Sequence, residues 1–98
     1  MPRLALAPEV VDDIDRLLDH QAQHGVTDSP QRIERLLESL DLLRHSPALG
    51  RPARGGKREL VIGEGTHGFV ALYRHVPELD TVFILALRHQ REQGYPPR

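Results

Sequence analysis

Three short apolar segments in the last third of the chain constrain its fold more than any other feature. They span residues 58–62, 69–74 and 81–87, and each is rich in β-branched, aromatic or other large apolar side chains. Residues 63–68 and 75–80 separate them, and connections this short favour hairpins between antiparallel neighbours. The sequence therefore predicts a three-stranded meander, with one face buried against the earlier part of the chain.

The third segment, residues 81–87, hardly alternates between apolar and polar side chains. An unbroken apolar run is typical of a strand covered on both faces, which places this segment toward the middle of the sheet. Residues 3–6 alternate in polarity and predict a further short strand near the start of the chain. If that strand pairs with residues 81–87, the third segment becomes central, as its composition requires.

Two amphipathic helices are predicted between the first strand and the meander. Pro8 suits the first turn of one helix, and Gly25 ends it. Ser29 is the predicted N-cap of the second helix, with Pro30 at its first position and Pro47 beyond its end. The apolar side chains at helical spacing are Val10, Ile14, Leu17 and Leu18, and then Ile33, Leu36, Leu37, Leu40 and Leu43. We therefore expect an α+β fold in a single domain, residues 1–98, with the order β-α-α-β-β-β. An antiparallel helical hairpin would pack on a mostly antiparallel four-stranded sheet.

The composition excludes several kinds of site. The 98 residues include no cysteine, which rules out disulfides, thiolate catalysis and cysteine-bound metal centres, and which suits a reducing cytoplasm. No apolar run reaches the length of a membrane span, and the first residues lack the apolar stretch of a secretory signal. We therefore expect a cytoplasmic protein without membrane contact. His20 and His24 lie one helical turn apart, but no third ligand is evident, so neither a metal site nor a cofactor is expected.

Charge is divided unevenly along the chain. Residues 1–50 carry five Arg and nine Asp or Glu, whereas residues 51–98 carry eight Lys or Arg and five Asp or Glu. Four cations, Arg51, Arg54, Lys57 and Arg58, follow the second helix with no acid among them. Together with Arg74 they are candidates for binding an acidic partner, although charged loops are more often simply solvated. The excess of positive charge is too small to establish nucleic-acid binding.

In their order and spacing, four segments resemble the RelE/ParE toxin superfamily. They are Ser46-Pro47-Ala48-Leu49-Gly50-Arg51-Pro52, Arg58-Glu59-Leu60-Val61-Ile62, Phe69-Val70-Ala71-Leu72-Tyr73-Arg74, and Ile84-Leu85-Ala86-Leu87-Arg88-His89 leading into Arg91. The resemblance covers essentially the whole chain. It implies a small bacterial toxin of a type II toxin-antitoxin module, neutralised by a cognate antitoxin that is ParD-like or similar. A higher-order complex of toxin and antitoxin is a further expectation.

The superfamily contains two different activities. By this resemblance, a RelE-like chain would cut messenger RNA on the ribosome, whereas a ParE-like chain would poison DNA gyrase by binding it. RNA cleavage needs groups that take and give a proton, and cations around the phosphate. Two basic positions of RelE fall on Leu60 and Val70 here, which are hydrocarbon side chains. The chain resembles ParE more closely, so gyrase inhibition is expected; a ribosome-dependent ribonuclease and a non-toxic relic that only binds its antitoxin are the alternatives.

A chain that acts by binding needs no catalytic residue. If it is instead a ribonuclease, the candidate groups are Arg58, Arg74, Arg88, His89 and Arg91. His89 is the best single candidate, because an imidazole titrates near neutral pH and the cations at positions 88 and 91 would lower its pKa. The alternative is that His89 only holds the polar tail, residues 88–98, to the sheet edge by a hydrogen bond. Tyr95 could stack on a base, but the two prolines that follow it favour a role as an anchor of the tail.

Overall fold

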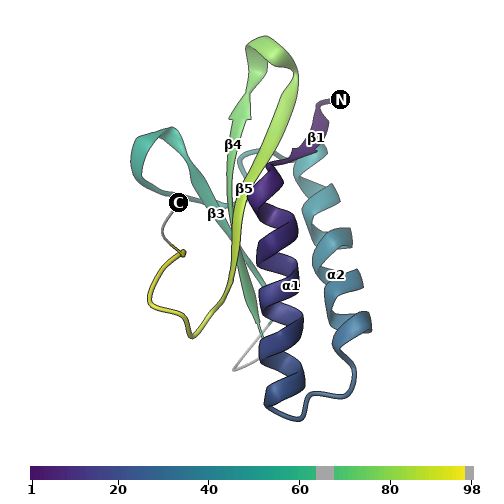
Figure 1. Ribbon diagram of the computed structural model, residues 1–98. Helices are drawn as coiled ribbons and strands as arrows, with labels where there is room; N and C mark the ends of the chain where they lie inside the picture. Colours follow the sequence, from purple (N-terminus) through teal and green to yellow (C-terminus); the bar gives the residue numbers. More distant parts are fainter. Residues whose placement is uncertain (64–67, 97–98) are drawn as a thin grey trace.

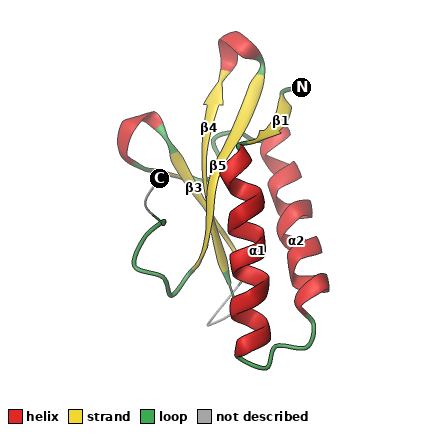
Figure 2. Ribbon diagram, in the orientation of Figure 1, coloured by secondary structure: helices red, strands yellow, loops and turns green. Residues whose placement is uncertain are grey.

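Two helices lie on one face of a twisted sheet, and the other face of the sheet is left without a covering helix (Figures 1 and 2). The structure is a computed structural model that describes residues 1–63 and 68–96. Helix α1 (Pro8–Gln23) and helix α2 (Ser29–Asp41) run in opposite directions beside each other. The predicted α+β architecture and the helical hairpin are confirmed.

The sheet has five strands in the spatial order β1-β5-β4-β3-β2. Their bounds are β1 (Arg3–Leu6), β2 (Arg51–Pro52), β3 (Arg58–Ile62), β4 (Phe69–Val76) and β5 (Thr81–His89). The meander is antiparallel throughout, and β1 pairs with β5 in parallel. The first strand therefore lies beside the third apolar segment, a pairing that the sequence left open, and this makes β5 an interior strand as its composition indicates. Of the predicted turn at residues 63–68, residues 64–67 lie outside the described part of the chain.

The expectation of four strands was wrong by one. Arg51 and Pro52, in the linker between the helices and the meander, pair with Glu59 and Arg58 of β3. Proline lacks a backbone N–H, so it is tolerated in a strand that lies at the edge of a sheet. The signal for β2 is two residues long, and no pattern in so short a stretch distinguishes a strand from a loop.

The apolar run in β5 has a different cause from the one expected. Leu72 of β4 pairs with Ala86, but Tyr73 pairs with Ile84, so Leu85 is an extra residue in β5. This β-bulge shifts the alternation by one position. Val82 and Ile84 before it, and Leu87 after it, all belong to the core. The run fails to alternate because both faces of β5 are apolar: Val82, Ile84 and Leu87 face the core, whereas Phe83, Leu85 and Ala86 face the open side of the sheet, which no described helix covers.

The helices begin and end close to their predicted positions. Helix α1 starts at Pro8 as expected, whereas the N-cap of α2 is Asp28, one residue before the predicted Ser29. The Asp28 carboxylate accepts a hydrogen bond from Nε of Arg32 at 2.7 Å, and this bond lowers the pKa of Asp28. Helix α2 ends at Asp41, and a short 3₁₀ turn carries the chain on to Arg44.

Tyr73 fastens the linker between the helices and the meander to the core. Its ring is fully buried, and its hydroxyl donates to the Pro47 carbonyl at 2.6 Å and accepts from the Gly50 N–H at 2.8 Å. A Cβ atom at Gly50 would lie 2.6 Å from the Glu59 carbonyl and 2.7 Å from the Tyr73 ring. Only glycine fits this approach of the linker to the sheet.

Candidate functional site

The five candidate groups for RNA cleavage do not converge on one point. Arg58 lies on the helix-covered side of the sheet, in register with Tyr73, and donates to the Gly50 carbonyl at 2.8 Å. Arg74 and Arg88 belong to the opposite face, where Arg74 donates to the Gly55 carbonyl and Arg88 to backbone carbonyls of the tail. His89 is buried beside α1, and Arg91 is exposed in the tail. The predicted site is therefore divided between the two faces of the sheet: Arg74 and Arg88 lie on the open face, whereas His89 and Arg91 line a common cavity on the helix-covered side.

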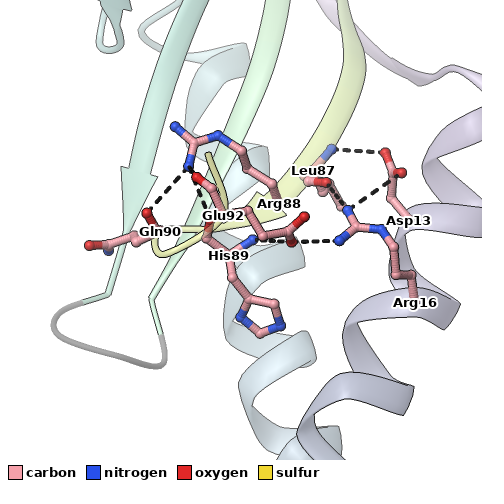
Figure 3. Close-up of polar contacts among 7 residues, drawn as sticks. All are labelled: Asp13, Arg16, Leu87, Arg88, His89, Gln90 and Glu92. Atoms are coloured by element: carbon pink, nitrogen blue, oxygen red, sulfur yellow. Dashed lines mark hydrogen bonds and ion pairs between the residues drawn. The ribbon is translucent and has the colours of Figure 1, made fainter. Parts of the chain in front are cut away.

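Side chains from α1 close the outer edge of β5, near its end (Figure 3). Strand β1 pairs with β5 only as far as Ile84, because the chain then turns into α1. Beyond that point the N–H of Leu87 donates to the buried Asp13 carboxylate at 3.0 Å, and Arg16 donates to the Leu87 carbonyl at 2.9 Å. Asp13 and Arg16 thus take the place of the strand that is missing there, which satisfies a backbone edge that would otherwise be free to pair elsewhere.

Glu92, in the tail, also binds to this edge of β5. Its carboxylate accepts from the backbone N–H of His89 at 3.0 Å and from the guanidinium of Arg16. Partial burial would raise the pKa of Glu92, but the bonds from Arg16 and His89 outweigh it and lower the pKa. These roles of Asp13, Arg16 and Glu92 could not be predicted from the sequence, because they depend on where β1 ends.

His89 sits in a place that suits packing better than catalysis. Its side chain is 3% exposed and turns toward α1, where its ring centroid lies 4.6 Å from that of His20 and 5.3 Å from that of Phe69. Burial lowers the pKa of His89, with further contributions from His20 and Arg16. The predicted direction of this shift is confirmed, but its predicted cause, the cations at positions 88 and 91, is not. Its burial against α1 places the ring on the side of the sheet opposite Arg74 and Arg88.

Arg88 holds the tail in place on the open face of the sheet. One guanidinium nitrogen donates to the carbonyls of His89, at 3.0 Å, and Glu92, at 3.0 Å (Figure 3). The guanidinium carbon also lies 5.2 Å from the centre of the Tyr95 ring. The Tyr95 hydroxyl donates to Glu59 at 2.6 Å, and burial together with this bond raises the pKa of Tyr95. The predicted role of Tyr95 as an anchor of the tail is confirmed.

An apolar groove with a cationic rim lies on the open face of the sheet. Its volume is about 450 Å³, and it lies between the turn at Arg54–Gly56 and the tail. The side chains that line it are Leu72, Phe83, Leu85 and Ala86 in the floor, and Lys57, Arg74 and Tyr95 at the rim. The bulge contributes Leu85 as an additional apolar side chain. We call this surface the open-face groove.

The structure separates the predicted partner-binding cations. Lys57 and Arg74 line the open-face groove, and Arg54 is exposed in the turn beside it. Arg51 pairs with Glu59 across the sheet edge at 3.3 Å, and Arg58 points to the other face. The five residues therefore do not form one patch, and only Lys57 and Arg74 share a concave surface with apolar side chains.

A second groove runs between α2 and the edge strand β3. It has a volume of about 460 Å³ and includes the apolar residues Leu42, Leu49 and Val61, each about half exposed. Within the described residues β2 pairs only with Arg58 and Glu59, so the rest of the β3 edge is open beside this groove. Exposed leucines beside an open strand edge favour the addition of a strand or helix from another chain.

No metal centre is built from the residues that the structure describes. His89 adds a third imidazole next to His20 and His24, which the sequence did not predict. Nevertheless, no group of three His, Cys, Asp or Glu side chains among residues 1–63 and 68–96 is arranged to hold a metal ion. None of the described helices is long and apolar enough to cross a membrane.

Comparisons with known proteins agree with this architecture. The profile of a family described as the ParE toxin of the type II toxin-antitoxin system parDE matches residues 4–94. Toxin RelE3 of Caulobacter vibrioides is 29% identical over 93 residues, which cover 95% of this chain and 99% of that protein. A chain of the chromosomal ParDE system from P. aeruginosa has the same fold, with a TM-score of 0.76 and 22% identity over 91% of this chain and 96% of that chain.

Proposed function

Because this chain belongs to the ParE toxin family of type II toxin-antitoxin systems, we propose that it inhibits DNA gyrase by binding it and that it cuts no RNA. Membership of the family implies a cognate antitoxin as partner. What the family does not decide is the target, since the relatives carry both ParE and RelE names. The geometry of the candidate groups supports a mechanism by binding.

The observation that carries this proposal is the separation of the groups that cleavage would require. Cleavage of a phosphodiester by its 2′-hydroxyl needs a base within hydrogen-bond reach of that hydroxyl and cations around the same phosphate. Here the imidazole of His89 is buried on one side of the sheet, while Arg74 and Arg88 lie on the other. Both arginines are also engaged with backbone carbonyls. No phosphate could contact all three groups at once.

The open-face groove is the surface we assign to the target. Its floor is apolar, and Lys57 and Arg74 at its rim are cations without a carboxylate among the lining residues. Glu59, the nearest acid, is occupied by Arg51, Arg88 and Tyr95. A segment of gyrase that carries a large apolar side chain next to acidic residues would complement this groove, because opposite charges around an apolar anchor favour specific association.

The groove between α2 and β3 is the surface we assign to the antitoxin. It offers an open strand edge and half-exposed apolar side chains at Leu42, Leu49 and Val61. An antitoxin segment could add a strand to β3 and place apolar side chains against α2. Under this assignment the antitoxin and the target occupy different faces of the toxin.

A supercoiling assay tests the proposed function. Purified protein should inhibit supercoiling of relaxed plasmid by gyrase in a dose-dependent way, and addition of the cognate antitoxin should restore the activity. A preparation inactivated by heat serves as the control for contaminants. Full supercoiling activity at a large molar excess of folded toxin over gyrase would contradict the proposal.

A further inference from the structure

A small polar cavity lies between the end of α1 and the end of β5, on the helix-covered side of the sheet. Its volume is about 260 Å³, and its lining includes three histidines, His20, His24 and His89, together with Gln21 and Arg91. It shares no lining residue with the open-face groove or with the groove beside β3. Neither the family nor the proposed function gives it a role.

Two of the side chains that line the cavity are buried without hydrogen-bond partners. Gln21 is 1% exposed, and neither its amide nitrogen nor its amide oxygen makes a hydrogen bond. Both ring nitrogens of His89, which is 3% exposed, also lack a hydrogen-bond partner. The Leu17 backbone is near enough to oppose the lowering of the pKa of the ring. Native proteins rarely leave buried polar groups unpaired, so these groups mark a place where a further molecule can bind.

The histidine rings form a stack that leads from the surface to the buried end of the cavity. The centroids of His20 and His24 are 4.1 Å apart, and His89 follows at 4.6 Å from His20. Nδ1 of His24 lies 2.8 Å from the carbonyl of His20, so the ring donates there and its Nε2 is left with a free lone pair. His20 and His24 are exposed, which gives a ligand access to the cavity.

The charges around the cavity favour an anion. Arg91 is exposed at the rim and makes no ion pair with any other described residue. Glu92 is the acid in the lining, and its carboxylate is committed to Arg16 and to the backbone of His89. Asp13 is likewise engaged by Leu87 and Arg16. The donors that remain are the Arg91 guanidinium, the Gln21 amide and the N–H groups of the imidazoles.

We propose that this cavity binds a small oxyanion, either a carboxylate or a phosphate-like group. Arg91 would contact the oxyanion at the rim, and the amide of Gln21 and an N–H of His89 would donate to it inside the cavity. Charge-assisted hydrogen bonds to an oxyanion are about twice as strong as neutral ones, which suits a site made of donors. A bound anion also stabilises the protonated form of nearby imidazoles, so binding should be tighter at lower pH.

The test is a titration followed by NMR of the histidine ring signals. Sulfate and acetate are the probes, because both keep their charge between pH 6 and pH 8, and chloride at equal ionic strength is the control. We expect saturable shifts of the His20, His24 and His89 signals, with at least fivefold tighter binding at pH 6 than at pH 8. Preference for sulfate would indicate a phosphate group as the ligand, and preference for acetate would indicate a carboxylate.

Two variants and a matched control locate the binding. Arg91→Gln should weaken binding of the preferred probe at least fivefold, whereas Arg54→Gln, at an exposed arginine elsewhere, should leave it unchanged. Gln21→Leu should abolish binding without lowering thermal stability, since Gln21 has no partner to lose. Linear shifts that chloride reproduces, or equal affinity in Arg91→Gln and wild type, would overturn the proposal. A crystal grown in the preferred probe with only water in the cavity would do the same.

Discussion

His89 shows how its surroundings decide what a titratable residue can do. It is the last residue of β5, the longest of the described strands, and it lies between Arg88 and Arg91 in the sequence, which makes it a candidate base. In the structure its ring is buried among Phe69 and the histidines of α1, and burial lowers its pKa. Burial favours the neutral form of the ring, which packs against α1 on the side of the sheet opposite Arg74 and Arg88.

The pH dependence of stability tests this environment. The folded-state pKa of His89 lies below its ordinary value of 6.5, so the unfolded chain binds the proton more readily. The free energy of unfolding should therefore fall as the pH decreases below about 6.5. The pKa of Glu92 is lowered from 4.5, so protonation of Glu92 should reduce the free energy of unfolding further only under more acidic conditions. Urea unfolding at pH 8, 6.5 and 5.5 measures this.

The His89→Phe variant is the control for this effect, because it keeps a planar ring of similar size next to Phe69. Its stability should depend less on pH between 6.5 and 5.5 than that of the wild type. The same pH dependence in both proteins would mean that another group is responsible and that the assignment to His89 is wrong.

Asp13 is a second residue whose role comes from the fold alone. It is 2% exposed, accepts from the N–H of Leu87 and pairs with Arg16 at 3.8 Å. Asp13→Ala would leave that N–H without its acceptor, and we expect it to lower the free energy of unfolding by about 2 kcal/mol. Chemical denaturation measures the loss.

Two further substitutions on α1 show whether the loss at Asp13 is specific. Asp13→Asn keeps an oxygen that can accept from the N–H of Leu87, so it should lower the free energy of unfolding less than Asp13→Ala does. Asp12→Ala, at an exposed position on the same helix, should change stability by less than about 0.5 kcal/mol. If Asp13→Ala lowered the free energy of unfolding no more than Asp12→Ala, the edge of β5 would not depend on the Asp13 carboxylate.

At the scale of elements, β5 organises the molecule. It pairs with β1 on one side and β4 on the other, and it supports α1 along its length. Its bulge at Leu85 places one more apolar side chain in the open-face groove while Leu87 returns to the core. Bulges of this kind redirect side chains near functional surfaces.

Substitutions in the open-face groove test its role as the target surface. Leu85→Lys should abolish growth arrest when the protein is expressed without its antitoxin, because it puts a charge into the apolar floor. Leu37→Lys, at an exposed leucine on α2, is the matched control and should remain toxic. Both variants should still bind the antitoxin in a co-purification experiment, which also shows that they fold. Full toxicity of Leu85→Lys would exclude the groove as the target surface.

The sequence predicted elements much better than it predicted contacts. Helix positions and the meander follow from periodicity and from short connections, whereas the pairing of β1 with β5 was only one of the arrangements that the sequence allowed. The bulge at Leu85 and the pairing of Arg51 with Glu59 do not, because they depend on a register that is fixed only when the sheet forms. The candidate cations were grouped because they are close in the sequence. Arg58 is in register with Tyr73, and side chains alternate along a strand, so Arg58 and Arg74 lie on opposite faces of the sheet.

At the scale of the whole molecule, the fold gives each of its surfaces a different chemistry. The open sheet face is apolar with a cationic rim, the α2–β3 edge offers an unpaired strand beside exposed leucines, and the end of α1 carries the polar cavity. Separate surfaces allow a toxin to be bound by its antitoxin without sharing residues with its target. Under the proposed function, toxicity arises from binding at the first of these surfaces.

Primer extension on translated transcripts, in the same cells in which plasmid supercoiling is followed, tests the central claim most directly. After induction of the toxin without its antitoxin, the account predicts relaxed plasmid DNA and transcripts whose ends match those of uninduced cells. New codon-specific ends in translated messages, with supercoiling unchanged, would contradict it.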